Sequence, residues 1–237
     1  MQIYFFRHGQ AGLRNHYDTL SELGREQARA LGRYLAAEGI RFGAVVAGAL
    51  ERQRETALET WRAAKDAGLA MPKPEVDAAW NEFDLEGVYR EVPPRLAGAD
   101  PEFAREYEAL AAALADPGHT AHHTWMPSDL AIVRAWIDGR FDLAIESWPE
   151  FNRRIERNLR GLPALGSGAA LAVFTSATPI AIAAGLAVGA GGPQLMRVAG
   201  VMYNSAISTF RYRDGDLMLF SFNGVPHLAE TRLRTFR

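Results

Sequence analysis

Apolar runs and amphipathic segments alternate along the first 70 residues of the chain. Residues 2–6 and 42–47 are short, mostly apolar runs, typical of strands that are buried on both faces. Between them, the leucines of residues 20–35 recur at helical spacing, and a second helix is expected from about residue 50 to 67. The order strand, helix, strand, helix predicts a parallel sheet with helices on both of its faces.

The region from about residue 88 to 147 interrupts this rhythm. It is rich in proline, and its clearest helical stretch covers residues 102–115. We interpret it as a largely helical cap, inserted after the third strand over the C-terminal edge of the sheet. The remaining expected elements are a helix at 148–162, a strand at 170–175, a helix at 179–187 and a hairpin of strands 206–212 and 217–222. The predicted fold class is a three-layer α/β sandwich with a mostly parallel sheet, one domain of residues 1–237 that carries this cap.

The composition narrows the classes of function. The 237 residues are 48% hydrophobic, with 26 basic and 28 acidic side chains and a formal net charge of −2. A nearly balanced charge favours neither nucleic acid nor an anionic membrane surface as a partner. The chain has no cysteine, which excludes disulfides and thiolate chemistry and fits a reducing compartment. We expect a cytoplasmic protein, and the sequence leaves its oligomeric state open.

One long segment needs a separate interpretation. Residues 161–196 contain no charged side chain, and a segment of that length would span a bilayer. It nevertheless carries Thr175, Ser176, Thr178 and Pro179 at its centre and glycines toward both ends. We therefore expect a buried strand, a turn and a buried helix, and no membrane span.

The most informative motif follows the first strand. Arg7, His8 and Gly9 stand where that strand ends, and ligands of open α/β sheets bind beyond the carboxyl ends of the strands. Gly9 permits a sharp turn and a close approach to a ligand. Imidazole is a competent nucleophile at neutral pH, and a guanidinium binds phosphate oxygens through a planar pair of donors. The motif therefore fits attack on a phosphate, and by itself it equally fits a strand end that exposes a histidine.

Two further segments carry suitable chemistry. Arg52 falls in the first turn of the helix after the second strand, where it can converge with Arg7 on one phosphate near a positive helix N-terminus. Glu82 follows the third strand, and a carboxylic acid there can protonate the leaving oxygen of a phosphoester. Asp84 and Glu86 are alternatives to Glu82, since three acids in five residues are also typical of a polar loop.

Together these motifs resemble the histidine phosphatase superfamily, also called the phosphoglycerate-mutase-like proteins. That family begins with a strand ending in Arg-His-Gly and carries a Leu-x-Arg-x-x-x-Thr-Ala segment, which residues 50–57 match. Residues 20–28 and 222–228 are similar to its first helix and its last strand. The resemblance covers both ends and the middle of the chain and leaves mainly the cap unmatched.

The resemblance implies a metal-independent hydrolase, without a cofactor, that acts on a small-molecule phosphate ester. His8 would attack phosphorus to form a phosphohistidine, Glu82 would protonate the leaving alcohol, and water would then cleave the phosphoenzyme. Arg7 and Arg52 would hold the phosphoryl oxygens in place of a metal ion. The alternatives are a phosphoglycerate-type mutase and a weakened or inactive protein that only binds phospho-ligands.

The main departure of the chain from the family pattern lies after the fourth core strand. The family places a second histidine after its fourth core strand, where this chain has Ser176. The loss of one preorganised donor costs about 3–4 kcal/mol in such sites, on the order of a hundred- to a thousandfold in rate. With Thr178 as N-cap and Pro179 as the first helical residue, a helix N-terminus would offset this loss, and Ser176, the backbone of Ala177 and Thr178 would bind the anion. Replacement of Ser176 by histidine is then expected to raise turnover.

Other polar residues are candidates for contacts with the substrate. Gln10 and Arg14 follow the first strand and are expected to reach the substrate or its phosphate. His119, His122 and His123 form a cluster whose spacing would suit a metal ion on a helix. No carboxylate lies within the cluster, so we assign no metal site to it, and a loop that faces the substrate is the alternative.

Overall fold

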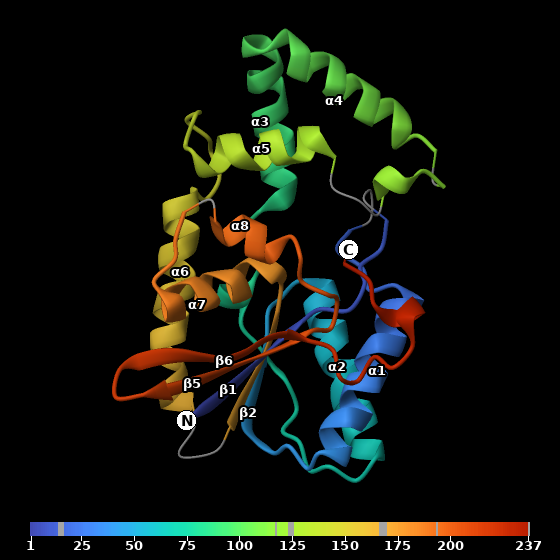
Figure 1. The fold of residues 1–237 in the computed structure, drawn as a ribbon, viewed down its shortest axis with the longest axis vertical. Helices are drawn as coiled ribbons and strands as arrows, with labels where there is room; N and C mark the ends of the chain where they lie inside the picture. The colour runs from blue at the N-terminus through green and yellow to red at the C-terminus, as the bar shows by residue number, and fades with distance from the viewer. Residues whose placement is uncertain (14–16, 117, 123–125, 166–169, 193, 237) are drawn as a thin grey trace. The chain divides into compact units, whose positions relative to one another are not determined.

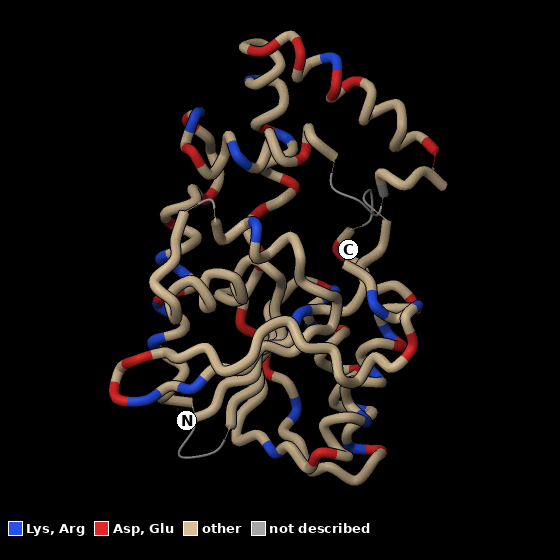
Figure 2. The backbone as a smooth tube through the Cα atoms, viewed as in Figure 1, with Lys and Arg blue, Asp and Glu red and all other residues tan. Residues whose placement is uncertain are grey.

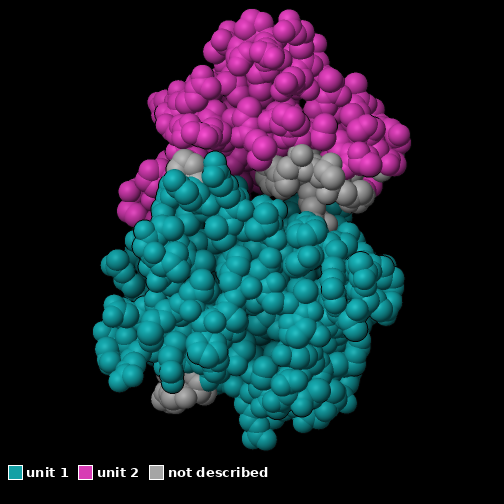
Figure 3. All heavy atoms as spheres, viewed as in Figure 1, with its two compact units in different colours: residues 1–12, 16–82, 154–237 teal, residues 13–15, 83–153 magenta. Residues whose placement is uncertain are grey.

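The computed structural model divides into two compact units, which Figure 3 shows in different colours. Unit 1 comprises residues 1–12, 16–82 and 154–237, and unit 2 comprises residues 13–15 and 83–153. The structure describes residues 1–13, 17–116, 118–122, 126–165, 170–192 and 194–236. The two units are described separately below.

Unit 1 contains a six-stranded sheet in the order β3-β2-β4-β1-β5-β6. The strands are β1 (Gln2–Arg7), β2 (Phe42–Ala47), β3 (Glu75–Val76), β4 (Ala170–Thr175), β5 (Ile207–Arg213) and β6 (Asp216–Gly224). The first four are parallel to one another, β5 pairs antiparallel with β1, and β6 pairs antiparallel with β5. The predicted hairpin is present, with Asp214 and Gly215 both at positive φ, as an Asp-Gly turn requires. The mostly parallel sheet expected from the sequence is confirmed.

Helices cover both faces of this sheet, which confirms the α/β fold. The helices are α1 (Glu22–Ala37), α2 (Glu51–Asp66), α6 (Trp148–Gly161), α7 (Ala177–Val188) and α8 (Gln194–Ala199). Figure 1 shows α1 and α2 on one side of the sheet and α7 on the other. Ser21 accepts a hydrogen bond from the Gly24 N–H and thereby starts α1, whose buried residues face α2.

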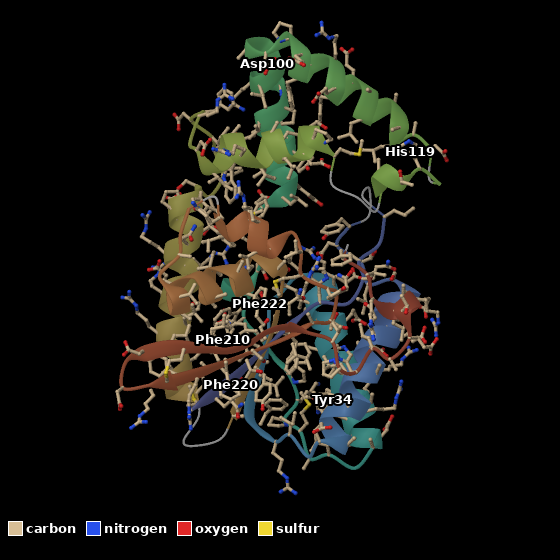
Figure 4. All side chains as sticks on the ribbon, viewed as in Figure 1. Tyr34, Asp100, His119, Phe210, Phe220 and Phe222 are labelled. Atoms are coloured by element: carbon tan, nitrogen blue, oxygen red, sulfur yellow. The ribbon has the colours of Figure 1, made fainter. Side chains whose placement is uncertain are left out.

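Aromatic side chains fill the centre of the sheet. Phe6 of β1 stacks on Phe174 of β4 with ring centroids 4.7 Å apart, and Phe210 of β5, labelled in Figure 4, meets Phe5 edge-on. Figure 2 shows the strands in the middle of unit 1 with few charged positions, while acidic and basic residues alternate over its helices and loops. A charged side chain buried among these residues therefore needs a partner that compensates for its loss of hydration.

The uncharged segment 161–196 supplies β4 and α7, as expected. All side chains of β4 after its first residue are buried, and α7 buries residues 178–185. No helix in the described part of the chain is both long enough and apolar enough to cross a membrane.

Unit 2 is largely helical. It contains α3 (Leu85–Ala99), α4 (Pro101–Ala113), α5 (Pro127–Ile137) and the beginning of α6. Pro93 and Pro94 lie inside α3, a helix that the proline-rich pattern did not predict. Each proline removes a helical hydrogen bond, but Val88, Val92 and Leu96 bury one face of α3 at helical spacing. Packing of that face outweighs the local preference against a helix.

Candidate functional site

Three parallel strands end at the same edge of the sheet. Arg7, the last residue of β1, lies opposite Thr175 of β4, and the His8 N–H donates a 2.9 Å hydrogen bond to the Thr175 carbonyl. On the other side of β4, the Gly48 N–H after β2 donates to the Phe174 carbonyl over 3.0 Å. This register brings His8, the start of α2 and Ser176 to one place at the carboxyl ends of the strands.

His8 is buried, with 2% of its surface exposed, and its two ring nitrogens have different partners. Nδ1 lies 2.7 Å from the Gly9 carbonyl, and Nε2 lies 3.3 Å from Arg52 Nε. A carbonyl only accepts, so Nδ1 carries the proton and the Nε2 lone pair faces Arg52. Burial holds the pKa of His8 well below its usual value, and the charges of Arg52 and Arg7 lower it further. His8 is therefore a neutral imidazole with Nε2 unprotonated.

Gly9 allows the turn after His8 to pack closely against helix α1. A Cβ at Gly9 would lie 2.5 Å from the Gly24 carbonyl oxygen of α1. The Gly9 N–H also donates to Thr56 Oγ1 of α2 over 2.9 Å. These two contacts fix the turn that follows His8.

Two guanidinium groups flank His8 inside the protein. Arg7 is 5% exposed and Arg52 is 4% exposed. Arg7 donates through Nη1 to the Met202 carbonyl, while its Nε has no hydrogen-bond partner among the described residues. Burial lowers the pKa of Arg7, and the charge of Arg52 acts in the same direction. An anion bound here would give the buried Arg7 Nε–H an acceptor and would offset the charge of the two guanidinium groups.

Asp18, which the sequence analysis did not single out, holds Arg52 in place. Its Oδ1 accepts from Arg52 Nη1 over 2.9 Å. Its carboxylate also lies 3.2 Å from the Glu51 backbone nitrogen and 3.4 Å from that of Arg52, at the first turn of α2. Asp18 therefore binds the helix N-terminus and the guanidinium together.

Tyr17, also missed, touches all three residues of the site. The Arg52 guanidinium carbon lies 4.8 Å from the centre of its ring, and the His8 ring meets it nearly perpendicularly with centroids 6.5 Å apart. Arg7 shares a side-chain hydrogen bond with Tyr17. No spacing rule marks a tyrosine in an irregular loop, so the sequence offered no signal for it.

Glu82 lies at the N-terminus of α7. Its Oε2 accepts a 3.2 Å hydrogen bond from the Thr178 N–H, and its charge favours the cationic form of Arg7. The two alternatives to Glu82 belong to unit 2: Asp84 caps α3 through the Gly87 N–H, and Glu86 is exposed in the first turn of that helix. Within unit 1 the structure associates Glu82 with Arg7.

The predicted start of α7 is wrong by two residues. The helix begins at Ala177 with Ser176 as the N-cap residue, so Thr178 is not the N-cap and Pro179 is the third helical residue. The first N–H groups of a helix need no helical partner, so proline fits at several positions of the first turn and does not define where the helix begins. The Ser176 side chain makes no capping bond and instead accepts from Gln53 Nε2 over 2.8 Å.

A family model described as the histidine phosphatase superfamily (branch 1) matches residues 3–125, about half of the chain. The chain belongs to this superfamily. The matched part includes Arg7, His8, Tyr17, Asp18, Arg52 and Glu82, and it ends before Ser176 and Met202.

Solved structures of low sequence identity share the histidine phosphatase fold. A phosphoglycerate mutase from Bacillus anthracis is 18% identical, with a TM-score of 0.64 over 97% of this chain and 95% of its own. A putative alpha-ribazole-5'-P phosphatase from Escherichia coli is 17% identical, with a TM-score of 0.62 over 94% and 97%. A mycobacterial glucosyl-3-phosphoglycerate phosphatase is 21% identical, with a TM-score of 0.57 over 94% and 98%. A search among curated proteins found no match.

The sequence also predicted Gln10 and Arg14 as contacts to the substrate. Gln10 Oε1 accepts from Ser21 Oγ over 2.9 Å at the start of α1, and within the described residues no hydrogen bond joins it to Arg7, His8 or Arg52. Arg14 lies outside the described residues.

The histidine cluster belongs to unit 2. His119, labelled in Figure 4, and His122 lie between α4 and α5, and His123 is outside the described residues. In the part of the chain that is described, no group of three or more histidines and acids is arranged to hold a metal ion.

Proposed function

We propose that this protein is a metal-independent phosphomonoester hydrolase that works through a phosphohistidine on His8. One observation carries the proposal: the unprotonated Nε2 of His8 lies beside the Arg52 guanidinium and next to Arg7, whose buried Nε has no partner among the described residues. A phosphate there would give Arg7 an acceptor and would present phosphorus to His8 Nε2.

In the first step His8 Nε2 attacks phosphorus in line, and the bond from phosphorus to the ester oxygen breaks. Glu82, protonated, gives its proton to that oxygen, so that a neutral alcohol leaves. Arg7 and Arg52 bind the non-bridging oxygens, whose negative charge persists throughout the transfer. The depressed pKa of His8 keeps its nucleophilic nitrogen unprotonated at neutral pH.

In the second step water attacks the phosphohistidine. The Glu82 carboxylate accepts the proton of that water, the bond from phosphorus to Nε2 breaks, and inorganic phosphate leaves. The Ser176 hydroxyl and the Ala177 N–H, at the start of α7, supply further donors to the phosphoryl oxygens, while the Thr178 N–H holds the Glu82 carboxylate. The cycle consumes one ester and one water and restores Glu82 to its protonated form.

Two further assignments belong to this proposal. The largely helical insertion at about residues 88–147 determines which ester is accepted, and Gln10 and Arg14 contact the substrate. A phosphoglycerate-type mutase would use the same first step, but it must retain the phosphoryl group on His8 until the product is rephosphorylated. Because Ser176 stands where the family has its second histidine, we favour hydrolysis over that more demanding cycle. If the protein has no turnover, the same replacement favours a protein that only binds phospho-ligands.

The test is release of inorganic phosphate from an aryl phosphate in the presence of a chelator, with wild type compared with His8→Ala. We expect metal-independent turnover that the variant lacks, together with an acid-labile phosphoryl label on the wild-type protein alone. Equal background in both proteins, repeated over a panel of natural phosphoesters, would overturn the hydrolase. Phosphate binding that remains in that case would identify the binder.

A further inference from the structure

Tyr17, in the loop before α1, lies against the residues at the end of β1. Its ring lies against the Arg52 guanidinium at 4.8 Å and meets the His8 ring edge-on, and its side chain shares a hydrogen bond with Arg7. Asp18, the next residue, is fixed by Arg52 Nη1 and by the start of α2. Tyr17 is thus held by its neighbour against the two cations and the imidazole.

The hydrogen bond to Arg7 defines what the Tyr17 hydroxyl can do. A guanidinium only donates, so Arg7 donates and the tyrosine oxygen accepts. A hydroxyl whose oxygen accepts from a cation becomes a stronger donor. An anion bound by Arg7 would therefore be next to this donor.

We infer that Tyr17 is a catalytic residue whose hydroxyl donates a hydrogen bond to a non-bridging oxygen of the phosphoryl group. The inference rests on the proposed function, and it adds the donor that the chain has in place of the second histidine of its family. Charge on the non-bridging oxygens is redistributed as phosphorus passes to His8, so a donor aimed at them acts mainly in the transition state.

Tyr17→Phe removes only the hydroxyl and keeps the ring on Arg52. Its matched control is Tyr212→Phe. Tyr212 lies on β5 next to Arg211, and Arg211 pairs with the first residue of β1. Tyr212 is therefore at the opposite end of the strands from His8. For each protein we would measure the dissociation constants of inorganic phosphate and of vanadate, which mimics the five-coordinate transition state, and the turnover of an aryl phosphate.

We expect Tyr17→Phe to weaken vanadate about tenfold more than phosphate and to lower kcat/KM on the order of a hundredfold. Tyr212→Phe should match the wild type. Tyr17→His, whose ring also donates, should recover part of the vanadate affinity, which a purely structural role of Tyr17 would not explain. This rescue keeps the test valid should Tyr17→Phe fold poorly.

Two results would overturn the inference. Tighter phosphate binding by Tyr17→Phe would mean that the hydroxyl competes with the anion for Arg7. Equal loss of both anions would mean that Tyr17 has no contact specific to the transition state. Both dissociation constants are measured without turnover. A wild-type protein that binds phosphate but hydrolyses no ester would therefore refute the proposed hydrolase activity. The Tyr17 contact would still be tested by comparing the phosphate and vanadate affinities of wild type and Tyr17→Phe.

Discussion

Gln53 of α2 donates a hydrogen bond through Nε2 to Ser176 Oγ, over 2.8 Å, at the residue that caps α7. Both side chains are buried, at 0% and 1% exposure, and Gln53 Oε1 has no hydrogen-bond partner among the described residues. That oxygen packs against Gly48, where a Cβ would lie 1.9 Å away. Gln53 therefore fills the space next to the position at which the family pattern has an imidazole.

This contact adds a condition to the expectation that Ser176→His raises turnover. The larger imidazole would press on the Gln53 amide, and overpacking of this kind costs about 1–3 kcal/mol. We expect Ser176→His alone to lower the melting temperature without a gain in turnover. The double variant Gln53→Ala with Ser176→His should gain on the order of a hundredfold in kcat/KM. Gln53→Ala is the control, and an equal gain from the single Ser176 variant would contradict the argument.

Glu82 offers a test based on the leaving group. An alkoxide needs a proton as its bond to phosphorus breaks, whereas p-nitrophenolate leaves without one. Glu82→Gln should therefore lower kcat/KM, which reports the transfer of the phosphoryl group to His8 and not its later hydrolysis, on the order of a hundred- to a thousandfold for an alkyl phosphate and much less for p-nitrophenyl phosphate. Glu86→Gln, in the first turn of α3, is the control and should behave as wild type. Equal losses on both substrates would exclude Glu82 as the general acid.

The sequence predicted those features that depend on local pattern. Strand β4 and the starts of β1 and β2 follow from apolar runs, and the convergence of Arg7, His8 and Arg52 follows from parallel strands that end at one edge. The structure brings these three residues together as expected.

Features that depend on tertiary contact could not be read from the sequence. Tyr17 and Gln53 reach the site from a loop and from the face of a helix, and neither position has a periodicity that indicates its partner. The prolines of residues 93 and 94 argue against a helix, but α3 forms because burial of one of its faces stabilises it. The start of α7 was misplaced because proline is compatible with every position of a first turn.

Asp18→Asn should separate binding from turnover. The carboxylate neutralises Arg52, so its loss leaves a more positive site that binds inorganic phosphate more tightly. Arg52 also loses the partner that aligns it, so kcat should fall about tenfold or more while the phosphate dissociation constant decreases. Calorimetric titration with phosphate and steady-state kinetics measure the two effects.

The matched control for Asp18→Asn is Asp100→Asn. Asp100, labelled in Figure 4, accepts from the backbone N–H groups of Glu102 and Phe103 at the start of α4. Both substitutions should lower stability by about 0.5–1 kcal/mol through loss of a negative charge at a helix N-terminus. Only the Asp18 variant should change phosphate affinity, and a parallel change in the Asp100 variant would show that the effect is one of general stability.

We expect His227 to make the stability of unit 1 depend on pH. Its Nε2 lies 2.8 Å from Ser205 Oγ, and the Ser205 N–H donates to the His8 carbonyl over 3.0 Å. Burial lowers the pKa of His227 from 6.5 to about 4. Below pH 6.5 the unfolded chain binds a proton that the folded protein refuses, so this contribution is complete above pH 6.5 and is lost as the pH falls toward 4.

We therefore expect the free energy of unfolding to fall by about 3 kcal/mol between pH 7 and pH 4 on account of this one group. His227→Gln removes the titrating ring, so its free energy of unfolding should depend less steeply on pH over that range. Ser205→Ala removes the hydrogen bond but keeps the ring, so it should lower stability at every pH and retain the wild-type slope. Urea unfolding at half-unit steps of pH measures all three proteins. If the free energy of unfolding depends equally on pH in wild type and His227→Gln, the folded protein does not hold His227 as a neutral ring.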